Sequence, residues 1–89
     1  MNDIQDVKNE IVVHLVGQLE ATGKERELVG QKIKQVRKQC GLTMIEFGKA
    51  LNVTNVTVCR WENGQRMPNV FTVLKIAKMG NMTVEEFLS

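Results

Sequence analysis

The 89-residue sequence contains no tyrosine, one histidine, two cysteines and one proline. So few groups that can exchange a proton or attack a substrate argue against an enzyme. Two cysteines form neither a disulfide framework nor a metal site, and we expect no metal and no cofactor. The longest apolar run, residues 11–13, is too short for a membrane-spanning helix or a signal peptide. These absences predict a cytoplasmic, non-enzymatic protein.

The residues that are present are typical of a soluble domain, with 43% hydrophobic and 25% charged residues. The length allows one core and an appendage. The net charge is −3 in residues 1–27, +7 in residues 28–81 and −2 in residues 82–89. A basic centre between acidic flanks favours a polyanion as the partner of the central residues, although a solvated surface accounts for these charges equally well.

Apolar periodicity predicts short helices along nearly the whole chain. The first, over residues 4–21, has one broad apolar face. That face comprises Ile4, Val7, Ile11, Val12, Leu15, Val16 and Leu19, with Val13 off it. Thr22 and Glu25 have the spacing of a capping box for a second helix, which runs to about Cys40 before Gly41 stops it.

Residues 42–64 predict two short helices joined by a tight turn. Thr43 caps the first helix, which ends at Leu51, and residues 52–54 form the turn. The second helix covers about residues 55–63 and stops at Gly64. Glycine is unfavourable inside a helix, and Gly48 stands inside the first of these helices. A close approach by the following helix explains why a residue without a side chain is present there. This arrangement is a helix-turn-helix.

We expect the core to include Phe47, Trp61, Phe71 and Leu74, together with Cys40 at the end of the second helix. On the helix over residues 55–63, Val58 and Trp61 share one side. Asn55, Val56, Cys59 and Arg60 share the other side, which the core does not need.

An ordered set of motifs extends over about residues 28–88. It comprises Val29-Gly30-Gln31-Lys32-Ile33, Val36-Arg37, Gly41-Leu42-Thr43, residues 47–54, residues 58–64, Pro68, Leu74-Lys75-Ile76-Ala77 and residues 82–88. This set resembles the Cro and phage-repressor type of helix-turn-helix domain, which is XRE-like. Met44 departs from the family pattern, which usually has glutamine there.

The resemblance implies an all-α, lambda-repressor-like five-helix bundle over residues 28–89. Residues 1–27 then form an extra N-terminal amphipathic helix and its connection. It also implies that the helix over residues 55–63 enters the major groove of DNA. Arg37 and Glu62 resemble the internal ion pair of the family, with a structural role.

The resemblance and side-chain chemistry together predict a DNA site. The candidates for reading bases are Asn55, Val56, Thr57 and Arg60, because their amide, methyl, hydroxyl and guanidinium groups suit base edges. The candidates for phosphate contacts are Thr43, Met44, Lys49, Asn63, Gln65 and Arg66.

The resulting hypothesis is a sequence-specific transcriptional regulator, a repressor that binds a palindromic operator as a homodimer. Ile4, Ile11, Leu15 and Leu19 are the expected dimer contacts, because two-fold dimers are the commonest assembly. Packing of this face on the bundle, or on a foreign protein, are the alternatives. A second hypothesis is an antitoxin-type interaction module that neutralises a toxin partner and also binds DNA.

Overall fold

The computed structural model describes residues 21–89, which form five helices. These are α2 (Gly23–Gln39), α3 (Met44–Leu51), α4 (Asn55–Glu62), α5 (Val70–Met79) and α6 (Val84–Leu88). The predicted all-α five-helix bundle is confirmed. The expected dimer contacts Ile4, Ile11, Leu15 and Leu19 lie outside the described residues. The division between residues 27 and 28 stays a prediction, and α2 runs across it.

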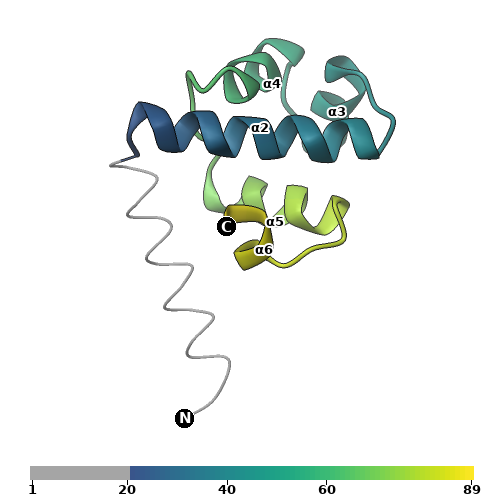
Figure 1. Cartoon of the computed structure of the whole chain (residues 1–89). Helices are drawn as coiled ribbons and strands as arrows, with labels where there is room; N and C mark the ends of the chain where they lie inside the picture. The colour runs from purple at the N-terminus through teal and green to yellow at the C-terminus, as the bar shows by residue number, and fades with distance from the viewer. Residues whose placement is uncertain (1–20) are drawn as a thin grey trace.

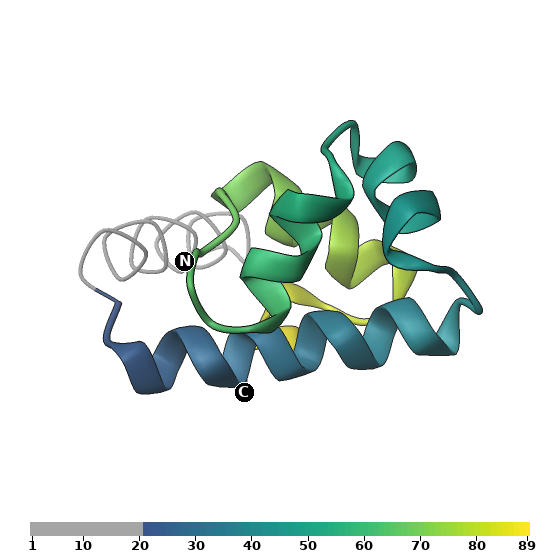
Figure 2. The same cartoon turned by 90° about the horizontal axis from the view of Figure 1, so that it is seen from above.

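The longest helix, α2, separates two pairs of shorter helices (Figure 1). α3 and α4 lie on one side of it, and α5 and α6 lie on the other. Viewed from above, α4 lies beside α2, and α3 lies toward the C-terminal end of α2 (Figure 2). α4 packs on both α2 and α3, whereas α5 and α6 pack on each other and on α2. No helix within residues 21–89 combines the length and the apolar character needed to cross a membrane.

Each helix starts at a side chain that satisfies a backbone N–H of its first turn. The capping residues are Thr22, Thr43, Thr54, Asn69 and Thr83. The predicted capping box of Thr22 and Glu25 is confirmed, and its backbone hydrogen bond lowers the pKa of Glu25. Left-handed residues follow the helix ends at Gly41, Asn52, Gly64 and Asn81.

The buried core draws on all five helices. It comprises Ile33, Val36, Phe47, Leu51, Val58, Trp61, Val73, Ile76, Ala77 and Phe87. The predicted burial of Phe71 is wrong, since this side chain is 71% exposed. The inward face of α5 carries Val73 and Ile76, and Phe71 lies two residues before Val73, on another face. Leu74 is only half-buried, and Cys40, beyond the last turn of α2, is exposed rather than buried.

The crossing of α2 and α4 depends on a position without a side chain. A Cβ atom added to Gly30 would collide with the carbonyl oxygen of Trp61 and lie 2.9 Å from that of Glu62. Both atoms belong to the backbone of α4, which cannot rotate away as a side chain can. Gly30 therefore sets how closely α4 approaches α2.

We predict that Gly30→Ala lowers the free energy of unfolding by about 1–2 kcal/mol. The overpacking at this contact outweighs the gain in helix propensity of about 1 kcal/mol. Denaturant titration followed by circular dichroism measures the change. Gly23→Ala is the matched control, because the nearest atom to its added Cβ is 3.8 Å away. Equal stabilities for the two variants would contradict the account of this crossing.

Candidate nucleic-acid interface

The turn between α3 and α4 is held by two backbone features. Asn52 adopts the left-handed conformation, with φ of 60°. A Cβ on Gly48 would lie 2.6 Å from the carbonyl oxygen of Val53, so the turn passes directly over α3. The sequence predicted such an approach by the next helix, and the structure assigns it to the turn that leads into that helix. These contacts set the direction in which α4 leaves α3.

The two sides of α4 differ as the sequence predicted. Val58 and Trp61 are buried against the core. Asn55, Val56 and Arg60 are exposed, and Val56 exposes 51% of its surface. The helix thus presents three of the four base-reading candidates to solvent.

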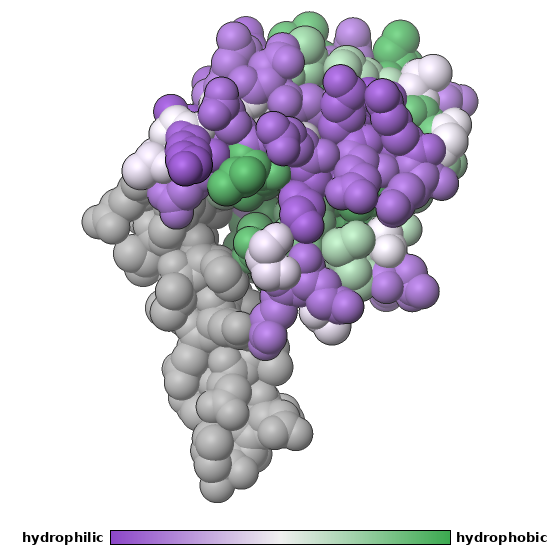
Figure 3. Space-filling model, viewed as in Figure 1, coloured by the Kyte–Doolittle hydropathy of each residue, from purple (hydrophilic) through white to green (hydrophobic). Residues whose placement is uncertain are grey.

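Thr57, the fourth base-reading candidate, lies differently. It is half-buried, and its hydroxyl is 3.2 Å from that of Thr54, the residue that caps α4. One of these hydroxyls donates to the other, so the side chain of Thr57 takes part in the start of the helix. In Figure 3, hydrophilic side chains cover most of the surface around α2, α3 and α4, with smaller apolar areas at its upper edge, on its right side and toward the left centre of the view.

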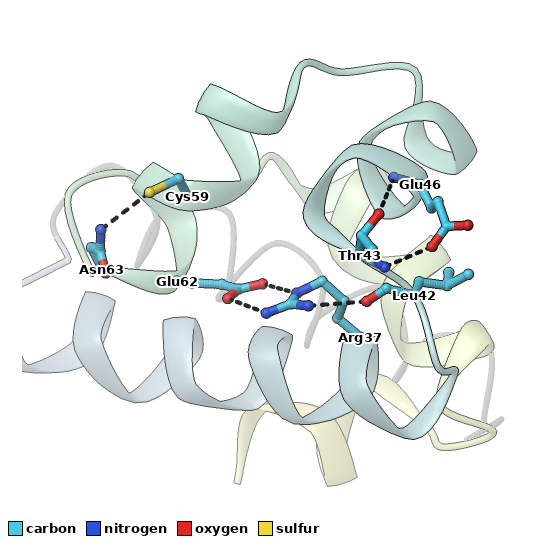
Figure 4. Close-up of polar contacts among 7 residues, drawn as sticks. All are labelled: Arg37, Leu42, Thr43, Glu46, Cys59, Glu62 and Asn63. Atoms are coloured by element: carbon cyan, nitrogen blue, oxygen red, sulfur yellow. Dashed lines mark hydrogen bonds and ion pairs between the residues drawn. The ribbon is translucent and has the colours of Figure 1, made fainter.

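A two-bond ion pair joins α2 to the end of α4 (Figure 4). Arg37 Nε lies 2.6 Å from Glu62 Oε2, and Arg37 Nη2 donates to Glu62 Oε1 at 3.1 Å. A third bond, of 3.0 Å, runs from Arg37 Nη1 to the carbonyl of Leu42. The two charged side chains are 11% and 2% exposed. The hydrogen bonds to Glu62 raise the pKa of Arg37 above its ordinary value. The pair lies between α2 and α4, and its charges are turned away from solvent.

The start of α3 holds the phosphate candidates Thr43 and Met44, and it already binds an anion of its own. The carboxylate of Glu46 accepts the backbone N–H of Thr43 at 2.9 Å, and this bond lowers the pKa of Glu46. Thr43 is exposed, whereas Met44 is half-buried against the core. A phosphate at this end would lie beside the Glu46 carboxylate, which weakens the electrostatic case for this contact.

The remaining phosphate candidates flank α4 and are all exposed. Lys49 lies in the last turn of α3, and Asn63, Gln65 and Arg66 follow α4. The side-chain nitrogen Nδ2 of Asn63 lies 3.3 Å from the Sγ atom of Cys59, one helical turn earlier in the chain. The backbone N–H of Gln65 donates to the carbonyl of Arg60 at 2.9 Å. The loop after α4 is therefore tied to the last turn of that helix.

Sequence reasoning missed one residue near this loop. The side chain of Arg26, on the first turn of α2, donates to the carbonyl of Gly64 at 3.1 Å. These two residues are 38 positions apart, and neither belongs to a local pattern that could have paired them.

In residues 21–89 no group of three His, Cys, Asp or Glu side chains is arranged to hold a metal ion.

Comparison with known proteins agrees with this geometry. Residues 33–87 match the family described as helix-turn-helix. The chain belongs to this family. The resemblance to the Cro and phage-repressor type is thereby confirmed.

Two relatives of this helix-turn-helix protein have regulatory names. It is 30% identical over 59 residues to the HTH-type transcriptional activator BcrR of Enterococcus faecalis, covering 66% of this chain and 29% of the relative. This chain is 31% identical over 52 residues to the repressor protein C2 of Salmonella phage P22, and the match covers 58% of this chain and 24% of that relative. The chain spans less than a third of the length of either relative. Both names agree with the expectation of a regulator rather than an enzyme.

A solved structure shares the fold. The clp gene regulator ClgR from C. glutamicum matches with a TM-score of 0.64 and 20% identity. The match covers 72% of this chain and 82% of that one. At this identity the likeness shows the fold alone.

We predict that Glu62→Ala destabilises the domain strongly, because it leaves the guanidinium of Arg37 buried without its carboxylate. The loss should lie near the lower end of about 3–5 kcal/mol, because Arg37 retains 11% exposure. Thermal melting detects the change. Glu85→Ala removes the same charge from an exposed position of α6 and should leave the melting temperature nearly unchanged. If the Glu62→Ala variant had the melting temperature of the wild type, the pair would contribute nothing to the stability of the domain.

Proposed function

We propose that this protein binds double-stranded DNA in a sequence-specific manner and regulates transcription, with α4 in the major groove. The observation that carries the proposal is the outward face of α4. Asn55, Val56 and Arg60 are exposed there, while Val58 and Trp61 hold the other side in the core. An asparagine suits adenine, an arginine suits guanine, and a valine packs on the methyl group of thymine. Thr57 is proposed as a further contact.

Contacts to the DNA backbone complete the proposed interface. Residues 28–81 carry a net charge of +7, which favours a polyanion. Lys49, Asn63, Gln65 and Arg66 flank α4 and are exposed, so they are suited to bind phosphates on both sides of the groove. Thr43 and the backbone N–H of Met44 are proposed for a further phosphate, at the positive end of α3.

The direction of regulation is proposed as repression. One similar protein is named as an activator and another as a repressor. Occupying a promoter is enough to block transcription, and this requires only a DNA-binding surface. The test is a gel shift and a footprint on the DNA upstream of the protein's own gene, with a reporter fused to that DNA. Protection without a fall in reporter output would reject repression, and no protection of any duplex would reject the function.

A homodimer on a palindromic operator is the proposed assembly. A single α4 reads only a few base pairs, whereas two copies related by two-fold symmetry read half-sites about 34–36 Å apart. The support is the sequence of residues 4–21, whose apolar face includes Ile4, Ile11, Leu15 and Leu19. The antitoxin alternative stays a hypothesis, and co-purification with the product of an adjacent small gene would test it.

We predict that Arg60→Ala and Arg66→Ala weaken DNA binding in different ways, although each removes one exposed arginine. Arg60→Ala should cost about 1–3 kcal/mol on the operator and relax the preference at one base pair. Arg66→Ala should weaken binding to all duplexes alike and lower the salt dependence by about one in slope. Competition titrations at several salt concentrations separate the two effects. Full sequence preference in the variant at position 60 would show that this face of α4 does not read bases.

We predict that Leu15→Asp converts a dimer into a monomer, because it puts a charge on the predicted apolar face. Val13→Asp is the matched control, since Val13 lies off that face and its variant should remain dimeric. Light scattering gives the mass of each full-length chain. A monomeric wild type whose Leu15→Asp variant loses thermal stability would place the face on the chain's own bundle instead.

A further inference from the structure

The guanidinium of Arg26 joins two stretches of backbone that are distant in sequence. Its Nε donates to the carbonyl of Gly64 at 3.1 Å, and its Nη1 donates to the carbonyl of Ala21 at 2.7 Å. Gly64 belongs to the loop that follows α4, and Ala21 precedes Thr22, the residue that caps α2. The bond to Ala21 fixes the plane of the guanidinium, because its N–H donors have a rigid fork geometry. Nε is thereby held toward the loop.

Gly64 lies directly against α2 at Glu27. Its φ of +73° suits glycine, and a Cβ there would lie 3.0 Å from Cγ and 3.1 Å from Cα of Glu27. Its own N–H donates to the carbonyl of Trp61 at 3.1 Å. The amide and the carbonyl of Gly64 are therefore both bound, the first to α4 and the second to α2.

Two of the proposed phosphate contacts, Gln65 and Arg66, come immediately after this residue. The side chains of both residues are exposed, so their order depends on the backbone. The peptide between Gly64 and Gln65 is held on both sides, because its N–H donates to the carbonyl of Arg60 at 2.9 Å and its carbonyl accepts from Arg26. A loop that is ordered before it meets its ligand loses less conformational entropy on binding, and the affinity is higher for that reason.

We infer that Arg26 is a positioning residue for the DNA-backbone contacts of the loop at residues 63–66. It acts through the carbonyl of Gly64 and touches no DNA itself. The inference rests on the proposed function and adds to it a residue of α2 that lies 38 positions before Gly64 in the sequence. It also explains why an arginine stands at this position: two carbonyls in fixed directions need a planar fork, which a lysine lacks.

The experiment compares Arg26→Ala, Arg26→Lys and Lys24→Ala in the full chain. Lys24 is an exposed residue of the same turn. Its variant therefore removes one positive charge but leaves the bond between Arg26 and Gly64 in place. Operator and unrelated duplexes are titrated at several salt concentrations, at a temperature where circular dichroism shows every variant folded. Amide hydrogen exchange at Gly64 and Gln65 is measured without DNA.

We expect Arg26→Ala and Arg26→Lys each to lower affinity for both duplexes by about tenfold, with an unchanged salt slope. Exchange at Gly64 and Gln65 should be faster in both, and Lys24→Ala should match the wild type throughout. Rescue by lysine, or a slope lowered by about one, would show that Arg26 binds phosphate as a charge and would overturn the inference. Unchanged exchange rates would overturn it as well. If the wild type bound no duplex, the proposed function would fall, whereas exchange would still decide whether Arg26 holds the loop.

Discussion

The contact between α2 and α4 is the constraint on which the proposed recognition surface depends. Gly30 lets the backbone of the last turn of α4 approach α2 at Trp61 and Glu62. Seven residues further along α2, Arg37 binds the side chain of Glu62 through two bonds and reaches the carbonyl of Leu42 with a third. The C-terminal end of this eight-residue helix is thus held against a longer one, with directional bonds that apolar packing alone lacks. The orientation of its outward face follows from groups that are themselves turned inward.

The helices themselves depend on one another in the same way. α3 to α6 have five to ten residues, and isolated helices of that length are marginal in water. Their capping side chains satisfy the first amides, but burial of an apolar stripe against the neighbours supplies most of the stability. Each helix is therefore stable only when the bundle is assembled. A domain of this size with shared contacts is expected to unfold cooperatively.

Sequence patterns predicted the features of this fold that depend on near neighbours. Helix starts and ends are signals of this kind. A threonine three residues before a glutamate marks a start, and an asparagine or glycine after an apolar stripe marks an end. Both act within one turn of chain, and the helix boundaries predicted from them were correct. The two faces of α4 followed from helical spacing. The burial of Phe71 was predicted from its aromatic character, yet its position relative to Val73 decided its exposure.

Contacts between distant residues required other information. Arg37 and Glu62 are 25 positions apart, and the family resemblance rather than any spacing suggested their pairing. Arg26 belongs to no motif of that resemblance, so its bond to Gly64 was found only in three dimensions. Exposure, bonding and chain direction at the loop after α4 are properties of the assembled bundle, which no local pattern encodes.

The separation of roles on α4 bears on how such a protein diversifies. Asn55, Val56 and Arg60 contribute no buried surface to the core, whereas Val58 and Trp61 on the same helix contribute much of it. We therefore expect the bundle to tolerate substitutions at the first three positions and to be destabilised by those at the other two. The outward side chains that we propose to read bases can therefore be exchanged, by mutation or by design, to address a different DNA sequence on an unaltered scaffold.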